Sequence, residues 1–165
     1  MDEITIRQVR PNDLEDCFIV EVAGFPPEEA ATRETIRLRI DTFPEGFLVA
    51  EVDGKVVGIL NSAATEKDDL GDEELKQMIG HHPAGKNMVV FALAILPAFQ
   101  KRGIARQLMA KFVEEARANE KQNVLLMCKQ PLIAYYEKMG FQHRGLSKST
   151  HGGAEWHEMR LVLKK

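Results

Sequence analysis

The sequence predicts a mixed α/β fold, because strand-like and helix-like stretches follow one another along its 165 residues. Residues 3–9 alternate apolar and polar side chains, as a strand with one buried face does. Residues 88–95 form a near-continuous apolar run, which is typical of a strand buried on both faces. Residues 103–119 carry an apolar side chain at every fourth position, which predicts an amphipathic helix.

The first third of the chain predicts two helices and a hairpin after the opening strand. Residues 11–22 begin with Pro-Asn-Asp, and residues 28–40 have acids in the first turn and arginines later, as helices prefer. Two further strand-like stretches, 46–52 and 55–65, are separated only by Asp-Gly. This dipeptide between alternating hydrophobics is a strong hairpin signal.

The rest of the chain predicts a polar segment and then further strands and helices. The polar segment, 66–87, contains one short helix-like stretch. The long helix follows a break at Pro97, and Gly140 marks the end of a later short helix. The remaining predicted elements are a short helix at 73–79, a buried strand at 123–127, a helix at 132–139, and two final strands, from 141 and over 156–163, around a turn at 151–153.

Composition excludes several classes of partner. The net charge is −3, the pI is about 6.0 and the charges are interspersed, so no basic surface for nucleic acid or membranes is predicted. No apolar run approaches the roughly 20 residues that span a bilayer, and the first residues do not resemble a signal peptide. We therefore expect a cytoplasmic protein with free thiols at Cys17 and Cys128. No cysteine–histidine cluster has the spacing of a metal site, so no metal is expected.

The most informative segment joins the apolar strand to the long helix. It has the pattern Gln100-x-x-Gly103-x-Ala105. Such a turn would present backbone N–H groups beside the positive end of a helix dipole, which is a geometry that binds phosphate. Glycine lets the backbone approach an anion closely. The alternative is an ordinary strand-to-helix turn with a basic surface. The candidate phosphate-binding residues are Gln100, Lys101, Arg102, Gly103, Ile104, Ala105 and Arg106.

This turn resembles the acetyl-CoA-binding signature of the GNAT acetyltransferases, Arg/Gln-x-x-Gly-x-Gly/Ala. A second element, residues 132–141 (LIAYYEKMGF), is similar to the superfamily's Ala-x-x-Phe-Tyr-x-Lys-x-Gly-Phe. The resemblance covers nearly the whole chain. It implies one GNAT domain over residues 1–165, with a central mixed, largely antiparallel sheet flanked by helices. It also implies acetyl-CoA as co-substrate.

Three segments resemble the arylalkylamine (serotonin-type) N-acetyltransferases in particular. They are residues 25–31 (FPPEEAA), 91–95 (FALAI) and 124–128 (VLLMC). The sequence departs from that subfamily at its two catalytic histidines, which have the spacing His-x-His, because Val89 and Phe91 stand at the matching positions. This departure puts the subfamily's proton path and its indoleamine specificity in doubt.

The resemblance also assigns roles to single residues. It places Leu93, Ala94 and Ile95 along the pantetheine arm, with the Leu93 N–H as a donor to the oxyanion. Tyr136 matches the family's general acid, and only the motif register favours it over Tyr135. His81 and His82 are candidate bases, since histidine titrates near neutral pH, but two solvated loop histidines are an equally good interpretation.

The predicted function is transfer of an acetyl group from acetyl-CoA to a primary amine, with a small-molecule amine as the expected acceptor. Two alternatives stay open: acetylation of protein N-termini or lysines, and a non-catalytic acyl-CoA-binding domain. The presence of Tyr136 beside an intact cofactor motif favours catalysis. The expected state is a monomer or a homodimer.

Overall fold

The computed structural model describes residues 3–68, 70 and 73–163. The chain packs as two compact units, Met1–Ser62 with Ala92–Phe112 and Ala63–Phe91 with Val113–Lys165. Strands β3 (Lys55–Thr65) and β4 (Asn87–Ile95) each contribute residues to both units. The prediction of one domain stays a prediction.

Seven strands are hydrogen-bonded in the order β1-β2-β3-β4-β5-β7-β6. The pairs β1–β2, β2–β3, β5–β7 and β6–β7 are antiparallel, and β4–β5 is parallel. Helices separate several of the strands in sequence, so the predicted mixed α/β class with a largely antiparallel sheet is confirmed. The other strands are β1 (Ile4–Gln8), β2 (Leu48–Val52), β5 (Asn123–Cys128), β6 (Gln142–Leu146) and β7 (His157–Val162).

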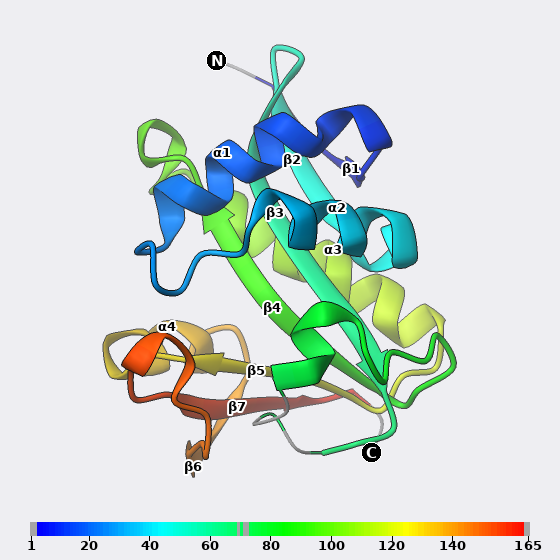
Figure 1. Ribbon diagram of the computed structural model, residues 1–165, viewed down its shortest axis with the longest axis vertical. Helices are drawn as coiled ribbons and strands as arrows, with labels where there is room; N and C mark the ends of the chain where they lie inside the picture. The colour runs from blue at the N-terminus through cyan, green and yellow to red at the C-terminus, as the bar shows by residue number, and fades with distance from the viewer. Residues whose placement is uncertain (1–2, 69, 71–72, 164–165) are drawn as a thin grey trace. The chain divides into compact units, whose positions relative to one another are not determined.

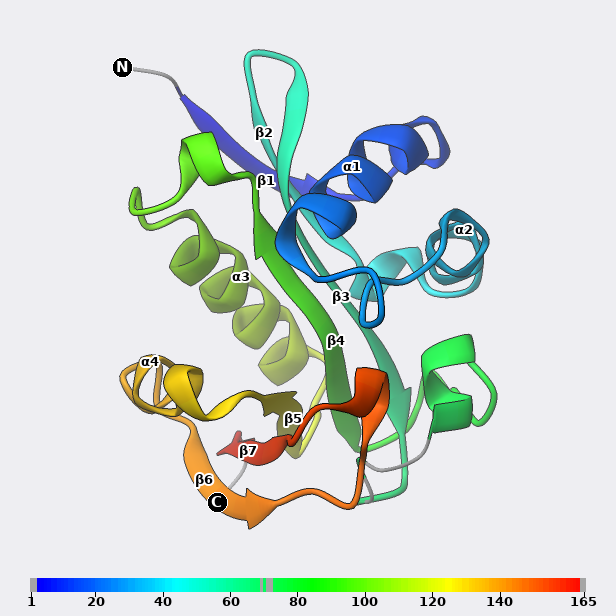
Figure 2. The same cartoon turned by 60° about the vertical axis from the view of Figure 1, so that its left-hand side comes forward.

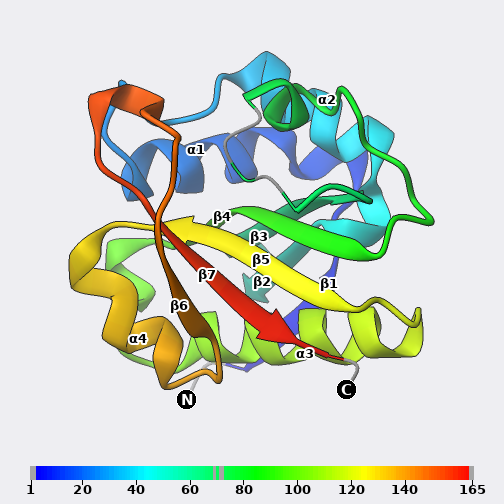
Figure 3. The ribbon, with the colours of Figure 1, turned by 90° about the horizontal axis from the view of Figure 1, so that it is seen from below.

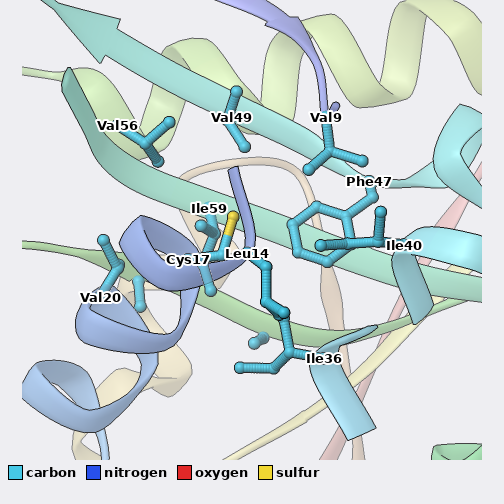
Figure 4. Packing of buried hydrophobic residues seen from close by; sticks show 12 residues of the cluster. Val9, Leu14, Cys17, Val20, Ile36, Ile40, Phe47, Val49, Val56 and Ile59 are labelled. Carbon is cyan, nitrogen blue, oxygen red and sulfur yellow. The ribbon is translucent and has the colours of Figure 1, made fainter. Parts of the chain in front are cut away.

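In the first unit, α1 (Leu14–Gly24) and α2 (Arg33–Thr42) lie side by side over one face of the strands (Figure 1). Their apolar side chains meet those of β2 and β3 in a closed core, in which Cys17 and Ile36 are fully buried (Figure 4). The first turns of α3 (Ile104–Ala118) lie on the opposite face (Figure 2). A side chain at Gly58 would collide with Ile95 at 2.7 Å, so glycine is needed where β3 and β4 pack closely.

The hairpin between β2 and β3 forms as predicted. Asp53 and Gly54 both have positive φ, 51° and 78°, as a two-residue turn of this kind requires. The predicted start of the second helix at residue 28 is wrong. The N–H groups of Glu29 and Ala30 both donate to the carbonyl of Pro26 at 2.9 Å, which makes a turn there. The helix begins after Thr32, whose hydroxyl accepts the N–H of Thr35 at 3.1 Å.

The second unit is built on β5, β7 and β6, with α4 (Ile133–Glu137) packed against β6 and β7 (Figure 3). Helix α4 is shorter than the helix predicted at 132–139, and a 3-10 turn, Gln130–Leu132, precedes it. The predicted short helix after β3 is a 3-10 turn, Glu73–Gln77. The predicted apolar stripe of α3 is confirmed, since its members are all buried: Ile104, Leu108, Met109, Phe112, Val113 and Ala116.

Both cysteines, Cys17 and Cys128, are free thiols, as expected, and both are buried. Burial raises the pKa of the Cys128 thiol to about 11. Within the described ranges, every helix is too short or too polar to cross a membrane.

Candidate functional site

The turn after β4 is fixed to the end of its strand. Pro97–Phe99 forms a 3-10 turn, and the side-chain amide of Gln100 reaches back to donate to the carbonyl of Ile95 at 3.1 Å. The N–H of Leu96 donates to the carbonyl of Val57 on β3 at 2.8 Å. The first residue of the predicted motif therefore holds the turn closed, which explains why a long side chain with an amide suits this position.

Two residues of the turn have left-handed backbone conformations. The φ angle is 64° at Lys101 and 79° at Gly103. A lysine in this region is uncommon and costs about 1–2 kcal/mol. A Cβ atom at Gly103 would meet no atom within 4 Å, so glycine serves the backbone conformation and leaves open space beside it. Turns with left-handed residues aim successive N–H groups into a concave surface that suits anions.

The N-terminus of α3 continues this surface. The hydrogen bond from the N–H of Gln107 to the carbonyl of Gly103, at 3.1 Å, begins the helical pattern. The N–H groups of Ile104, Ala105 and Arg106 precede that bond, so the helix itself leaves them unpaired. The Ile104 side chain is buried and anchors the first turn. This helix end carries partial positive charge.

Three cationic side chains are exposed around the turn: Lys101, Arg102 and Arg106. The Arg102 guanidinium lies 5.2 Å from the centre of the Phe99 ring, which holds it near the turn. The first turn of α3 contains no acidic residue. N–H donors, open space at Gly103 and positive charge together fit a pyrophosphate group.

The strand segment Leu93-Ala94-Ile95 lies outside the β4–β5 ladder. The pairs of that ladder run from Asn87–Asn123 to Val90–Leu126. The backbone of Leu93 is therefore not used in this ladder. Ala94 packs against α1, since a Cβ at Gly24 would lie only 2.9 Å from the Ala94 Cβ.

Tyr136 and Tyr135 differ sharply in environment. Tyr136 is 7% exposed and packs edge-to-face on Phe141 at 5.8 Å between ring centres, whereas Tyr135 is 38% exposed. Burial raises the pKa of the Tyr136 phenol well above its usual value, with smaller contributions from Tyr135 and Cys128. The phenol therefore keeps its proton throughout the neutral range. Its hydroxyl makes no hydrogen bond to any residue that the structure describes.

The two candidate bases lie in the loop that follows the Glu73–Gln77 turn. The Nδ1 atom of His81 accepts the N–H of Ala64 at 3.1 Å. Its neutral ring must therefore carry its hydrogen on Nε2. His82 is exposed, and its own N–H donates to the carbonyl of Ala64 at 2.8 Å. His81 thus supports the loop in this structure, and the role of either residue as base stays a prediction.

Lys121 has a supporting role that the sequence did not suggest. It is buried, and its Nζ donates to the carbonyls of Pro83 and Gly85 at 2.5 and 2.7 Å. These partners lie 38 and 36 residues away in sequence, so no local pattern could have revealed them. The bonds fix the loop that carries the two histidines. Among the residues with defined positions, no group of three or more histidines, cysteines or carboxylates is placed to hold a metal.

The Acetyltransferase (GNAT) family matches residues 12–141. The sequence is 28% identical to a mycothiol acetyltransferase of Acidothermus cellulolyticus, over 87% of this chain and 46% of that protein. It is 27% identical to the uncharacterized N-acetyltransferase YkwB of Bacillus subtilis, over 68% of this chain and 55% of that protein. The chain thus spans about half the length of these two relatives. It is 26% identical to the serotonin N-acetyltransferase of Mesocricetus auratus, over 96% of this chain and 77% of that protein.

Solved structures share the fold. The loading GNATL domain of CurA from Lyngbya majuscula superposes with a TM-score of 0.87 at 18% identity, over 98% of both chains. The yncA protein of Salmonella typhimurium, solved with acetyl-CoA, gives 0.71 at 16% identity, over 99% of this chain and 95% of that one. These likenesses confirm the predicted fold, and the family match confirms the predicted membership of the GNAT acetyltransferases. The chain belongs to the Acetyltransferase (GNAT) family, whose match extends over most of its length.

Proposed function

We propose that this protein transfers the acetyl group of acetyl-CoA to the nitrogen of a small primary amine. The observation that carries the proposal is the turn from Gln100 to Arg106. Its left-handed residues, its unpaired helix N–H groups and its three cations lie together directly after β4, and these features support anion binding there. The pyrophosphate of acetyl-CoA would be held there, with the pantetheine arm along Leu93–Ile95.

The reaction forms an N–C bond and breaks the C–S bond of the thioester. The neutral amine attacks the carbonyl carbon, and negative charge develops on the carbonyl oxygen, for which the Leu93 N–H is the proposed donor. The C–S electron pair leaves with sulfur, and the thiolate takes a proton from Tyr136. The pKa of an ordinary phenol already exceeds that of an ordinary thiol, and burial raises the pKa of Tyr136 further, so this proton transfer on its own is uphill. We infer that it accompanies C–S cleavage instead of following it.

The attacking amine must also lose a proton. The positions of the serotonin-type histidines hold Val89 and Phe91, which cannot accept one. His81 already accepts the Ala64 N–H on Nδ1, so it could act as a base only by giving up that bond. Exposed His82, or water, is the better candidate.

A small amine is the acceptor that the curated relatives favour. The hamster relative is named for serotonin, which is a small primary amine, and it aligns over nearly the whole of this chain. Phe91 in place of a histidine makes a different acceptor from serotonin plausible for this protein. Peptide N-termini and lysines are the competing acceptors, and a non-catalytic acyl-CoA-binding domain is the competing class.

The test is a panel of acceptors incubated with purified protein and acetyl-CoA, with the released thiol measured by a colorimetric reagent. The panel contains arylalkylamines, alkyl amines, diamines and short peptides with free N-termini. Thiol release with at least one small amine, absent in Gly103→Glu, supports the proposal. Release with peptides alone would assign the competing acceptor class. Acetyl-CoA binding without any release would assign a non-catalytic role.

A further inference from the structure

A charged cavity lies in the second unit, outside the residues assigned to the reaction. Its volume is about 170 Å³. Since a water molecule occupies roughly 30 Å³, the cavity has room for about five waters or a small organic molecule. Leu70, Leu125 and Met159 contribute the apolar part of its wall. Four charged residues line the rest: Asp68, Arg144, Glu158 and Arg160.

The sheet register brings these charges together. Arg160 on β7 stands opposite Leu125 on β5 and opposite Gln142 on β6. Glu158 is two residues earlier on β7, so it projects from the same face of the strand. Asp68 follows β3, and its Oδ1 accepts the side-chain amide of Asn87 at 2.9 Å.

Arg160 has donor capacity that its neighbours leave unused. Its Nε atom is buried and has no hydrogen-bond partner among the residues with defined positions. Its Nη2 lies 3.5 Å from Asp68 Oδ1, which is long for an ion pair between hydrogen-bonding groups. A guanidinium has five N–H donors in a fixed planar fork. An acceptor in the cavity would satisfy the buried Nε and complete this fork.

The other two charged groups of the cavity, Arg144 and Glu158, differ from Arg160 and Asp68, which face each other. In the part of the chain that the structure describes, neither Arg144 nor Glu158 forms an ion pair or a side-chain hydrogen bond. Asp68 already faces Arg160 and Asn87. Among the described residues, the cavity therefore offers the Arg144 guanidinium and the Glu158 carboxylate without a partner, beside the free Nε of Arg160, and a single anion would leave the carboxylate of Glu158 unmatched.

We propose that this cavity binds a small zwitterion of the α-amino-acid type, with its carboxylate on Arg160 and Arg144 and its ammonium group on Glu158. Arginine is the side chain best suited to a carboxylate, because its fork matches the two oxygens. A ligand with both charges pairs every unmatched group, whereas a ligand with one charge does not. Binding at this cavity does not rest on the proposed function; only its use as an acceptor would.

The test is calorimetric titration of the full chain, without acetyl-CoA, using glycine and L-alanine as probes. Acetate lacks the ammonium group and glycinamide lacks the carboxylate, so they serve as single-charge probes. We expect saturable binding of the two amino acids and at least about tenfold weaker binding of either single-charge probe. Arg160→Gln and Glu158→Gln should each weaken amino-acid binding by about tenfold or more. Arg117→Gln, an exposed arginine on α3, is the matched control and should change nothing.

Three results would overturn the proposal: neither amino acid binds the wild-type protein at millimolar concentration, acetate binds as tightly as glycine, or Arg160→Gln binds glycine as the wild type does. If Arg160→Gln does not fold, the single-charge probes and Glu158→Gln decide. Adding acetyl-CoA to the bound amino acid then distinguishes its use. Release of thiol identifies the zwitterion as an acceptor, and retained binding without release identifies it as an effector. Failure of every amine in the acceptor panel would refute the proposed function without touching this binding result.

Discussion

Two glycines of this protein allow phosphate binding by the turn from Gln100 to Arg106 to be tested against a matched control. Gly103 in the turn and Gly54 in the β2–β3 hairpin have φ angles of 79° and 78°. A Cβ at either position would meet no atom within 4 Å. Replacing either one by glutamate therefore imposes the same backbone strain without a clash. Only at Gly103 does the new carboxylate stand where a pyrophosphate is proposed to bind.

The magnitudes follow from the backbone and from ligand linkage. A side chain in the left-handed region costs about 1–2 kcal/mol. For 165 residues the entropy of unfolding is about 0.35 kcal/mol per kelvin, so this strain lowers Tm by roughly 3–6 °C in both variants. Acetyl-CoA at a hundredfold excess over its Kd stabilises the folded state by about 2.7 kcal/mol, which raises Tm by roughly 8 °C.

Thermal unfolding with and without acetyl-CoA separates the two effects. The wild type and Gly54→Glu should both gain about 8 °C at that excess of cofactor. Gly103→Glu should start from a Tm similar to that of Gly54→Glu and gain less than about 2 °C, because the glutamate repels the pyrophosphate and fills its space. An undiminished gain in Gly103→Glu would refute the assignment of the turn. Loss of the gain in both variants would show that strain alone, and not position, abolishes binding.

Three further predictions concern proton transfer and pH. Tyr136→Phe should lower kcat by roughly 10²–10⁴-fold with little change in acetyl-CoA affinity. The control Tyr135→Phe, at an exposed position, should leave kcat nearly unchanged in the same steady-state assay. The reverse pattern would identify Tyr135 as the general acid. If either histidine is the base, the double substitution His81→Gln and His82→Gln should lower kcat/KM at least about tenfold at pH 7 and by less above the pKa of the amine. A double variant whose kcat/KM equals that of the wild type at both pH values would exclude both histidines. Because burial raises the pKa of the Cys128 thiol from 9.0 to about 11, its contribution to stability is complete below pH 9 and is lost between pH 9 and 11. Urea unfolding at pH 8 and pH 10 should therefore show a smaller alkaline loss in Cys128→Ala than in the wild type, and equal losses would contradict this cause.

Elements whose cause is local could be predicted from sequence. The Asp53-Gly54 dipeptide determines a tight turn by its own backbone preferences, so the hairpin was found at the correct residues. The apolar stripe of α3 likewise needs only its own period to indicate which face is buried. The geometry of the Gln100–Gly103 turn also has a local cause, since both residues act within a few positions of the helix that follows, whereas phosphate binding there stays a prediction.

Competition between local signals caused the error at the second helix. Glu28 and Glu29 are acids of the kind that favour the first turn of a helix, and they are the reason for the predicted helix over residues 28–40. The carbonyl of Pro26 instead takes two N–H groups that such a helix would leave free, and Thr32 caps a helix that begins later. The acids that suggested an early start therefore lie in the turn, and Glu29 is buried there. A capping hydroxyl decides the start of this helix more strongly than first-turn charge does.

The protons of the reaction depend on contacts that no local pattern contains. The N–H of Ala64 donates to Nδ1 of His81, which lies 17 residues later in the sequence. Cys128 contributes to the raised pKa of Tyr136. With Nδ1 engaged, the remaining ring nitrogen of neutral His81 carries a hydrogen and is a donor, so this ring cannot accept a proton without first breaking its hydrogen bond. A buried phenol with a raised pKa is likewise a donor and not an acceptor. Tyr136 and His81 are thus both placed as donors, and in the proposed reaction the amine would lose its proton to His82 or to water. Under the proposed function, Val89 and Phe91 at the positions of the serotonin-type histidines favour acceptors that reach the site with their nitrogen already neutral.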